Sequence, residues 1–328
     1  MVLLTGCSSL TGKSLLAKLI AAGIHVRCYD FFKPKELPSD IECFAGLLAN
    51  DANLKAALTG VRAVIHCMDI KRPDARGRRF MKKLNVQGTA NILSAAQAVG
   101  VSKFIFVSSH SVFGKKSRFA PLLFGSPYKP ATAYGRDKLK AEAACRAFAK
   151  QTGMKITIMR PAAQVCPSIK DPAVLSSLLM CLGMGNENRM YAAGGSARYQ
   201  LLHTEDFAEA TLLALSSNAS VGQTYNVAAS DTPYRKDELL ELQRRLGIKF
   251  NVKVISLIRL KIYRALLSCV GAHLFKGEHF WFLAGKDLLS CNKIKEHLGW
   301  QPKYSNTDIL EETFRWYIKD KLKVQDYK

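Results

Sequence analysis

Acidic side chains are scarce in this chain of 328 residues, which carries 26 Asp and Glu against 48 Lys and Arg. The difference, 48 − 26, is a formal net charge of +22. An excess of this size favours an anionic partner over a cationic one. A phosphorylated small molecule, an acidic lipid surface and nucleic acid all meet that description.

The sequence also lacks paired cysteines and long apolar runs. Its nine cysteines are scattered and form no CxxC pair, so neither a disulfide framework nor a zinc ribbon is indicated, and we expect a cytoplasmic location. No stretch reaches the roughly 18 consecutive apolar residues of a membrane-spanning helix. No metal-ligand spacing appears either, so we expect no metal site.

Short apolar segments alternate with helical patterns over about the first 160 residues. Parallel strands need crossover connections, so this alternation predicts an α/β fold with a Rossmann-like, doubly wound parallel sheet. Strands are expected at 2–5, 25–30, 41–44, 63–67 and 104–108, and helices at 54–58, 80–99 and 141–151.

A glycine-bearing turn follows the first expected strand. A P-loop would need four residues between its first glycine and the Gly-Lys-Ser, whereas five separate Gly6 from Gly12. A dinucleotide turn fits better, because Gly6 permits a tight exit from the strand and Gly12 lets the helix pack closely on the sheet. Main-chain N–H groups at the helix N-terminus would then face a pyrophosphate.

Asp30 ends the second expected strand, 24 residues after Gly6. A carboxylate there can accept both ribose hydroxyls of NAD and repel a 2′-phosphate, although a helix cap or a solvated loop acid is the alternative reading. Arg27 and Lys33 nearby leave NADP open. The cofactor predicted from these residues is NAD.

Tyr134 and Lys138 are four residues apart, which places a phenol and an ammonium on one face of a helix. A close cation lowers the pKa of a phenol towards the range of a general base. Ser108 to Ser111 directly follow a strand, at the sheet edge where open α/β folds bind ligands. A serine there can hold a carbinol oxygen while Tyr134 takes its proton and a nicotinamide takes the hydride.

With these motifs the sequence resembles the extended short-chain dehydrogenase/reductases of the NAD-dependent epimerase/dehydratase family, over essentially its whole length. The resemblance is carried by Thr-Gly through Gly at 5–12, Asn-Val-Gln-Gly-Thr at 85–89, Gly-Val-Ser-Lys-Phe at 100–104, Ser-Ser-His-Ser-Val-Phe-Gly at 108–114, Tyr134 to Lys138, Arg-Pro at 160–161, Tyr-Asn-Val at 225–227 and Leu-Gly-Trp-Gln-Pro at 298–302.

The resemblance implies roles for individual residues. The implied catalytic residues are Ser109, Tyr134 and Lys138. Implied cofactor contacts come from Gly6, Ser8, Ser9, Leu10, Gly12, Asp30, Cys67, Asn85, Lys138 and Pro161, and implied substrate contacts from Ser109, His110, Ser111, Tyr134 and Arg198.

Four positions depart from the family pattern. Ser9 replaces the middle glycine of the turn, and Leu47 stands where an aspartate usually meets the adenine. The sequence His66-Cys67-Met68 replaces a small-residue turn. His110 and Ser111 replace the Asp-Glu pair of sugar-nucleotide dehydratases, which argues against 4,6-dehydration.

We therefore expect a NAD-dependent oxidoreductase or epimerase acting at a secondary alcohol, with a nucleotide sugar as substrate for 4-epimerisation or keto reduction. The expected domains are a NAD-binding Rossmann domain at 1–165, which also receives strands from about 198–228, and a mainly substrate-binding lobe at 166–328. A homodimer is expected as well.

The excess positive charge has competing interpretations. Cations cluster after the fourth and fifth strands, at 71–83 and 115–118, where they could steer a diphosphate or form a solvated face. Residues 249–277 hold six Lys and Arg and no acid, so the segment 249–285 is either a core element or a peripheral membrane contact. Sterol-type members of the superfamily that the chain resembles carry apolar elements in this region, so the resemblance implies a first alternative function, a 3-beta-hydroxysteroid-type dehydrogenase using NAD(P) on a sterol or lipid alcohol at a membrane surface. A nucleotide-binding scaffold on RNA is the second, disfavoured because a scaffold would not need Ser109, Tyr134 and Lys138.

Overall fold

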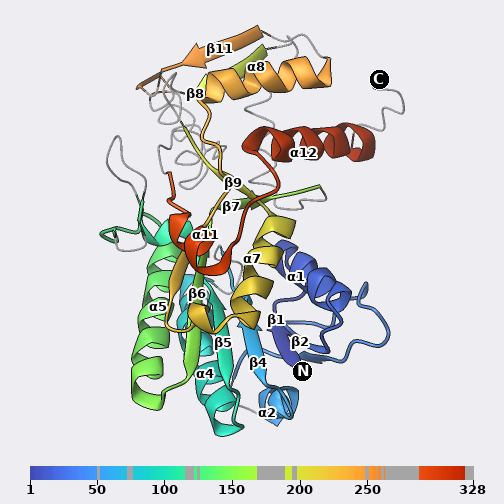
Figure 1. The fold of residues 1–328 in the computed structure, drawn as a ribbon, viewed down its shortest axis with the longest axis vertical. Coiled ribbons are helices and arrows are strands. Elements are labelled where there is room, and N and C mark those ends of the chain that lie inside the picture. Colours follow the sequence, from blue (N-terminus) through green and yellow to red (C-terminus); the bar gives the residue numbers. More distant parts are fainter. Residues whose placement is uncertain are drawn as a thin grey trace.

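The computed structural model describes residues 1–49, 52–71, 77–114, 122–123, 126–167, 189–193, 198–247, 251–256, 258–259, 262 and 288–321. They form an α/β structure around a seven-stranded parallel sheet with the strand order β10-β6-β5-β4-β1-β2-β3 (Figure 1). The predicted fold class is confirmed. The strands of this sheet are β1 (Val2–Thr5), β2 (Val26–Asp30), β3 (Cys43–Ala45), β4 (Ala63–His66), β5 (Lys103–Val107), β6 (Lys155–Pro161) and β10 (Thr224–Val227).

Helices cover both faces of the sheet, which is why its central strands are apolar without interruption. The helices are α1 (Leu10–Ala21), α2 (Ala52–Leu58), α3 (Gly77–Lys82), α4 (Thr89–Ala98), α5 (Ala133–Thr152), α7 (Thr204–Ser216), α8 (Arg235–Leu246), α11 (Asn292–Leu298) and α12 (Asn306–Lys321).

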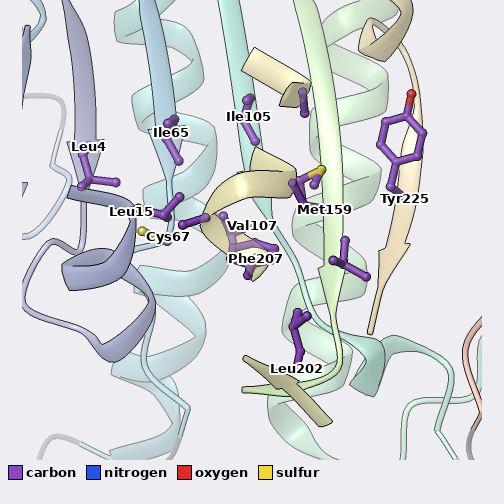
Figure 2. Packing of buried hydrophobic residues seen from close by; sticks show 14 of the residues in the cluster. Leu4, Leu15, Ile65, Cys67, Ile105, Val107, Met159, Leu202, Phe207 and Tyr225 are labelled. Atoms are coloured by element: carbon purple, nitrogen blue, oxygen red, sulfur yellow. The ribbon is translucent and has the colours of Figure 1, made fainter. Parts of the chain in front are cut away.

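Successive strand residues enter opposite cores. Leu4 and Ile65 pack with α1 and α7 in the cluster of Figure 2, whereas Leu3 and Val64 pack with α2, α4 and α5. This alternation fixes the register of each strand, since a slip by one residue would exchange the two cores.

The residues predicted as a helix over 80–99 are helical from Gly77 to Ala98, but not α-helical throughout. A π-helical turn at Lys83–Gly88 separates α3 from α4. Such turns often occur at functional sites. Asn85 within it is buried and reaches the segment that follows β4.

The remaining strands form two small sheets. β7 (Ala163–Val165) pairs with β9 (Leu201–His203), and β8 (Arg189–Ala193) pairs with β11 (Asn251–Ile255). Of the strands expected from residues 198–228, β10 joins the main sheet and β9 does not. A third apolar cluster joins β7 and β9 to α8 and α12 in the upper half of the molecule in Figure 1.

Most of the basic segment 249–285 lies outside the described residues. Within the described part of the chain, no helix is both long and apolar enough to cross a membrane.

Candidate active site at the carboxyl edge of the sheet

Three functional segments leave the same edge of the sheet because β1, β4 and β5 are parallel neighbours. The glycine turn follows β1, the segment from Cys67 to Lys71 follows β4, and Ser108 to Ser111 follow β5. In open α/β sheets this edge is where ligands bind.

Close backbone packing requires glycine at both ends of the first turn. Gly6 has a φ of +78°, and a Cβ there would lie 2.8 Å from the Met68 main chain. A Cβ at Gly12 would lie 2.0 Å from the Gly6 carbonyl oxygen. The turn therefore brings the start of α1 against both β1 and the segment after β4.

Ser9 caps α1, which explains its presence at the family's middle glycine. Its hydroxyl donates to the Gly6 carbonyl at 2.7 Å and accepts from the Gly12 N–H at 3.0 Å. Ser8 and Leu10 flank it, with Ser8 exposed and Leu10 half-buried. The helix N-terminus keeps further N–H donors for an anion.

The Asp30 carboxylate is buried at the end of β2 and joins that strand to the glycine turn. One oxygen accepts from the Ser8 N–H at 2.7 Å and lies 3.5 Å from the Cys7 sulfur, and the other accepts from the Phe31 N–H at 2.7 Å. A carboxylate offers about four acceptor positions, so Asp30 retains capacity for ribose hydroxyls. The turn and Asp30 thus fit the adenosine half of a dinucleotide.

The other predicted cofactor residues surround this edge. Cys67 is buried, and its thiol donates to the Thr5 carbonyl at 2.8 Å. Asn85 accepts from the Ile70 N–H at 2.8 Å and donates to the Ile70 carbonyl at 2.9 Å. Its amide therefore fixes the segment after β4. Pro161 ends β6.

His66 lies beneath this edge as a neutral imidazole. Burial lowers its pKa to about 3, and the Lys138 ammonium adds to the effect. The Thr89 hydroxyl donates its single proton to the Asn85 carbonyl, so towards His66 Nε2 its oxygen acts as the acceptor. The Thr5 hydroxyl donates to His66 Nδ1. These bonds assign the proton to Nε2 and give His66 a structural role.

Tyr134 and Lys138 meet at a third residue, Asp69. The Tyr134 hydroxyl donates to Asp69 Oδ2 at 2.7 Å, and Lys138 Nζ lies 2.7 Å from the same oxygen. Lys138 also donates to the Val107 carbonyl at 2.7 Å. Burial raises the pKa of the Asp69 carboxyl, but Lys138, Lys71 and the Tyr134 hydroxyl together outweigh that effect and leave the pKa below its usual value. Asp69 is therefore an anion at neutral pH.

Asp69 is absent from the residues predicted from the sequence. The rule that located Ser109, a polar side chain following a strand at the carboxyl edge, applies to it as well, since it stands three residues after β4. Its two partners are remote in the sequence, so only the fold reveals the contact.

Ser109 belongs to a tight turn against the start of α5. Its Oγ accepts from the Ser111 N–H at 3.2 Å and from the Ser111 hydroxyl at 2.9 Å, and neither bond uses the Ser109 proton. A Cβ at Gly135 would lie 2.4 Å from the Ser111 carbonyl oxygen. Glycine at 135 thus lets the helix turn that carries Tyr134 approach the Ser109 turn.

A buried ion pair supports this arrangement from below. Glu142 on α5 accepts from Arg160 at 2.6 and 2.7 Å, and both side chains are fully buried. Glu142 also accepts from the Ser108 hydroxyl at 2.6 Å. Burial raises the pKa of Glu142, but Arg160 and the other donors hold it below its usual value.

The predicted substrate residues His110 and Arg198 have partners of their own. His110 Nδ1 donates to the Pro161 carbonyl at 3.2 Å, and burial lowers the pKa of the imidazole. Arg198 Nε donates to the Thr232 carbonyl at 2.7 Å, and its guanidinium lies over Tyr234.

The basic cluster after β4 is only partly a charged rim. Arg78 makes a two-pronged ion pair with buried Asp137 at 2.6 and 2.7 Å, so it anchors α5. Arg79, Lys82 and Lys83 are exposed. Arg72 and Arg76, and the cations of 115–118, lie outside the described residues.

No group of three or more His, Cys, Asp or Glu side chains in the described part of the chain is arranged to hold a metal ion.

Known proteins match this chain in sequence and in fold. Residues 2–228 match the model of the NAD dependent epimerase/dehydratase family. The uncharacterized protein y4nG of Sinorhizobium fredii is 27% identical over 96% of this chain and 78% of its own length. A UDP-glucose 4-epimerase of Vibrio cholerae is 23% identical over 97% of this chain and 95% of its own length.

A solved structure shares the fold. The UDP-glucuronic acid 4-epimerase of Bacillus cereus in complex with NAD superposes with a TM-score of 0.75 at 20% identity, covering 96% of this chain and 97% of its own. The family match confirms the predicted class of enzyme and its dependence on NAD. The chain belongs to the NAD-dependent epimerase/dehydratase family.

Proposed function

We propose that this chain transfers a hydride at a secondary alcohol of a nucleotide sugar, as a 4-epimerase or a keto reductase. The observation that carries the proposal is the grouping of Tyr134 and Lys138, both within hydrogen-bond distance of Asp69, beside the Ser109 turn at the sheet edge. Phenol, ammonium and serine hydroxyl are the groups that an alcohol oxidation needs.

In this mechanism the Ser109 hydroxyl holds the carbinol oxygen and Tyr134 exchanges its proton. Lys138 would donate to the hydroxyls of the nicotinamide ribose, and its charge favours ionisation of the phenol. NAD, when bound, accepts the hydride from the carbinol carbon. A positioned acid–base group of this kind contributes about 10²- to 10⁴-fold in rate.

The cofactor would lie along the edge from α1 to α5. Gly6 and Gly12 would admit the pyrophosphate beside Ser8, Ser9 and Leu10 at the start of α1, and Asp30 would accept the hydroxyls of the adenosine ribose. Cys67, Asn85 and Pro161 border the nicotinamide half. Asp30 then favours NAD over NADP.

A nucleotide sugar is the substrate class that fits the surroundings best. The relatives from V. cholerae and B. cereus are epimerases of UDP-sugars. Exposed Lys71, whose charge acts on Asp69, would attract a diphosphate, as would Arg79 and Lys82, which are exposed on α3. Arg198 is the proposed further contact.

Epimerisation or reduction is favoured over 4,6-dehydration. His110 is a half-buried imidazole whose Nδ1 proton is bonded to the Pro161 carbonyl, and Ser111 bonds to Ser109. Neither supplies the carboxyl pair that the dehydratases carry at these positions.

The test incubates the purified chain with NAD or NADH and a panel of UDP-glucose, UDP-glucuronic acid, dTDP-glucose, a nucleotide-linked 4-keto sugar and a sterol alcohol. A 4-epimerase yields the C4 isomer without net change in NADH absorbance, whereas a keto reductase consumes NADH with a keto sugar. Oxidation of the sterol with no turnover of any sugar would contradict the proposal. The exposed variant Arg136→Ala serves as a control for handling losses.

A further inference from the structure

Asp69 lies between the two side chains that carry the proposed chemistry, yet that chemistry gives it no task. A single oxygen, Oδ2, accepts from the Tyr134 hydroxyl at 2.7 Å and pairs with Lys138 Nζ at 2.7 Å. The Asp69 side chain is 15% exposed and that of Lys138 is 3% exposed. This is a partly desolvated charge cluster in which each contact is strengthened by the low local dielectric.

The bond to Asp69 conflicts with both roles of Tyr134. A phenol has one proton, so a Tyr134 that donates to Asp69 does not donate to a substrate oxygen. As a base, Tyr134 would have to ionise beside an existing anion, which disfavours the phenolate. The Tyr134–Asp69 bond must therefore open before either proton transfer.

Asp69 also engages the cation that the mechanism assigns to the nicotinamide ribose. Lys138 has three N–H donors, of which one reaches the Val107 carbonyl at 2.7 Å and another reaches Asp69. The carboxylate neutralises much of the charge that would otherwise promote ionisation of Tyr134.

The position of Asp69 is built into the fold. Asn85 holds the next residue, Ile70, by both its N–H and its carbonyl, at 2.8 and 2.9 Å. Asn85 itself is buried in the π-helical turn between α3 and α4. The titratable or charged groups around Asp69 are Tyr134 and Lys138 from α5, His66 and Cys67 from the end of β4, and Lys71 from its own segment.

We propose that Asp69 is a positioning residue that holds the acid–base pair in a resting arrangement, with the proton kept on Tyr134 and Lys138 engaged. Binding of the cofactor opens this arrangement, because the ribose competes with Asp69 for Lys138. The inference rests on the proposed function only in its assignment of Tyr134 and Lys138.

The first test removes the charge with Asp69→Asn and follows tyrosinate absorbance during a pH titration of the cofactor-free protein. Subtracting the same titration in a Tyr134→Phe background isolates this phenol. The ionisation constant of Tyr134 should rise about 10- to 1000-fold, the range that one neighbouring charge produces.

Asp231→Asn is the control, because Asp231 is a half-buried carboxylate that accepts from the Asn306 N–H at the start of α12 rather than contacting α5 residues of the site. Its Tyr134 titration should coincide with that of the wild type. Equal titrations in Asp69→Asn and the wild type would overturn the proposal.

The second test measures equilibrium binding of NAD by calorimetry, without substrate. Asp69→Asn and Asp69→Ala should each bind NAD about three- to tenfold more tightly, as expected if roughly a tenth to a third of the wild-type protein is open. Weaker binding would make Asp69 a cofactor ligand and contradict the resting arrangement. Two variants are used so that a folding defect in one does not decide the result, and circular dichroism checks that each is folded.

Neither measurement uses a sugar. Failure of the substrate panel would therefore overturn the proposed function and leave this inference standing. Unchanged Tyr134 titration and unchanged NAD binding in the Asp69 variants would overturn this inference and leave the proposed function standing.

Discussion

Gly135→Ala is expected to lower turnover sharply, although alanine is the better helix former. Gly135 lies in the first turn of α5, directly after Tyr134. A Cβ there would lie 2.4 Å from the Ser111 carbonyl oxygen, whereas ordinary contact begins at 3.4 Å. The two backbones must separate by about 3.4 − 2.4 = 1.0 Å, which moves Tyr134 away from the Ser109 turn.

A misplacement of about 1 Å at reacting groups costs about 10²-fold in rate. Helix propensity alone would stabilise the alanine variant by about 1 kcal/mol, but overpacking costs about 1–3 kcal/mol. We expect kcat/KM to fall about 100-fold and the thermal midpoint to fall or stay level.

The assay compares kcat/KM and thermal unfolding of the wild type, Gly135→Ala and Arg136→Ala. Arg136 is the next residue of α5 and is exposed. A Gly135→Ala variant that is fully active and more stable than the wild type would refute the steric reasoning.

Three further predictions concern stability and cofactor choice. Glu142→Gln leaves the buried Arg160 without its counter-charge and should lower the free energy of unfolding by about 3–5 kcal/mol in urea; a loss below about 1 kcal/mol would contradict it. His66 has a pKa of about 3 when folded against 6.5 ordinarily, so the unfolded state binds more protons between those values and stability falls on acidification. From pH 7 to 5 the loss from His66 is about 2 kcal/mol, with a smaller contribution of the same sign from His110; equal unfolding free energies at the two pH values would exclude it. Asp30→Ala should narrow the preference for NAD over NADP in binding assays. A wild-type protein that prefers NADP would contradict the assignment of Asp30 to the adenosine ribose.

The sheet and the glycine turn were predictable because local patterns specify them. Apolar strands covered on both faces, such as β1 and β4, appear as uninterrupted hydrophobic runs. Gly6, Gly12 and Asp30 have fixed offsets within one strand–helix–strand unit. Periodicity alone could not reveal the π-helical turn at Lys83–Gly88, which interrupts a pattern that is apolar on both sides.

The candidate site was predictable where its residues belong to one short sequence motif, as Tyr134 and Lys138 do on a single helix. Asp69 is 65 residues from Tyr134, and Arg78 is 59 residues from Asp137. Contacts of that span depend on how the helices pack. The same packing pairs Arg78 with Asp137, so Arg78 anchors α5 instead of contributing a free charge to the rim of the site.

The central claim is that Tyr134 carries the proton transfer of a NAD-dependent reaction at a secondary alcohol. The most direct measurement compares Tyr134→Phe with the wild type in turnover of the substrate from the panel and in equilibrium binding of NAD. Turnover should fall about 10²- to 10⁴-fold, because the phenol proton is lost, while the NAD dissociation constant stays within a few-fold. Undiminished turnover in Tyr134→Phe would contradict the account.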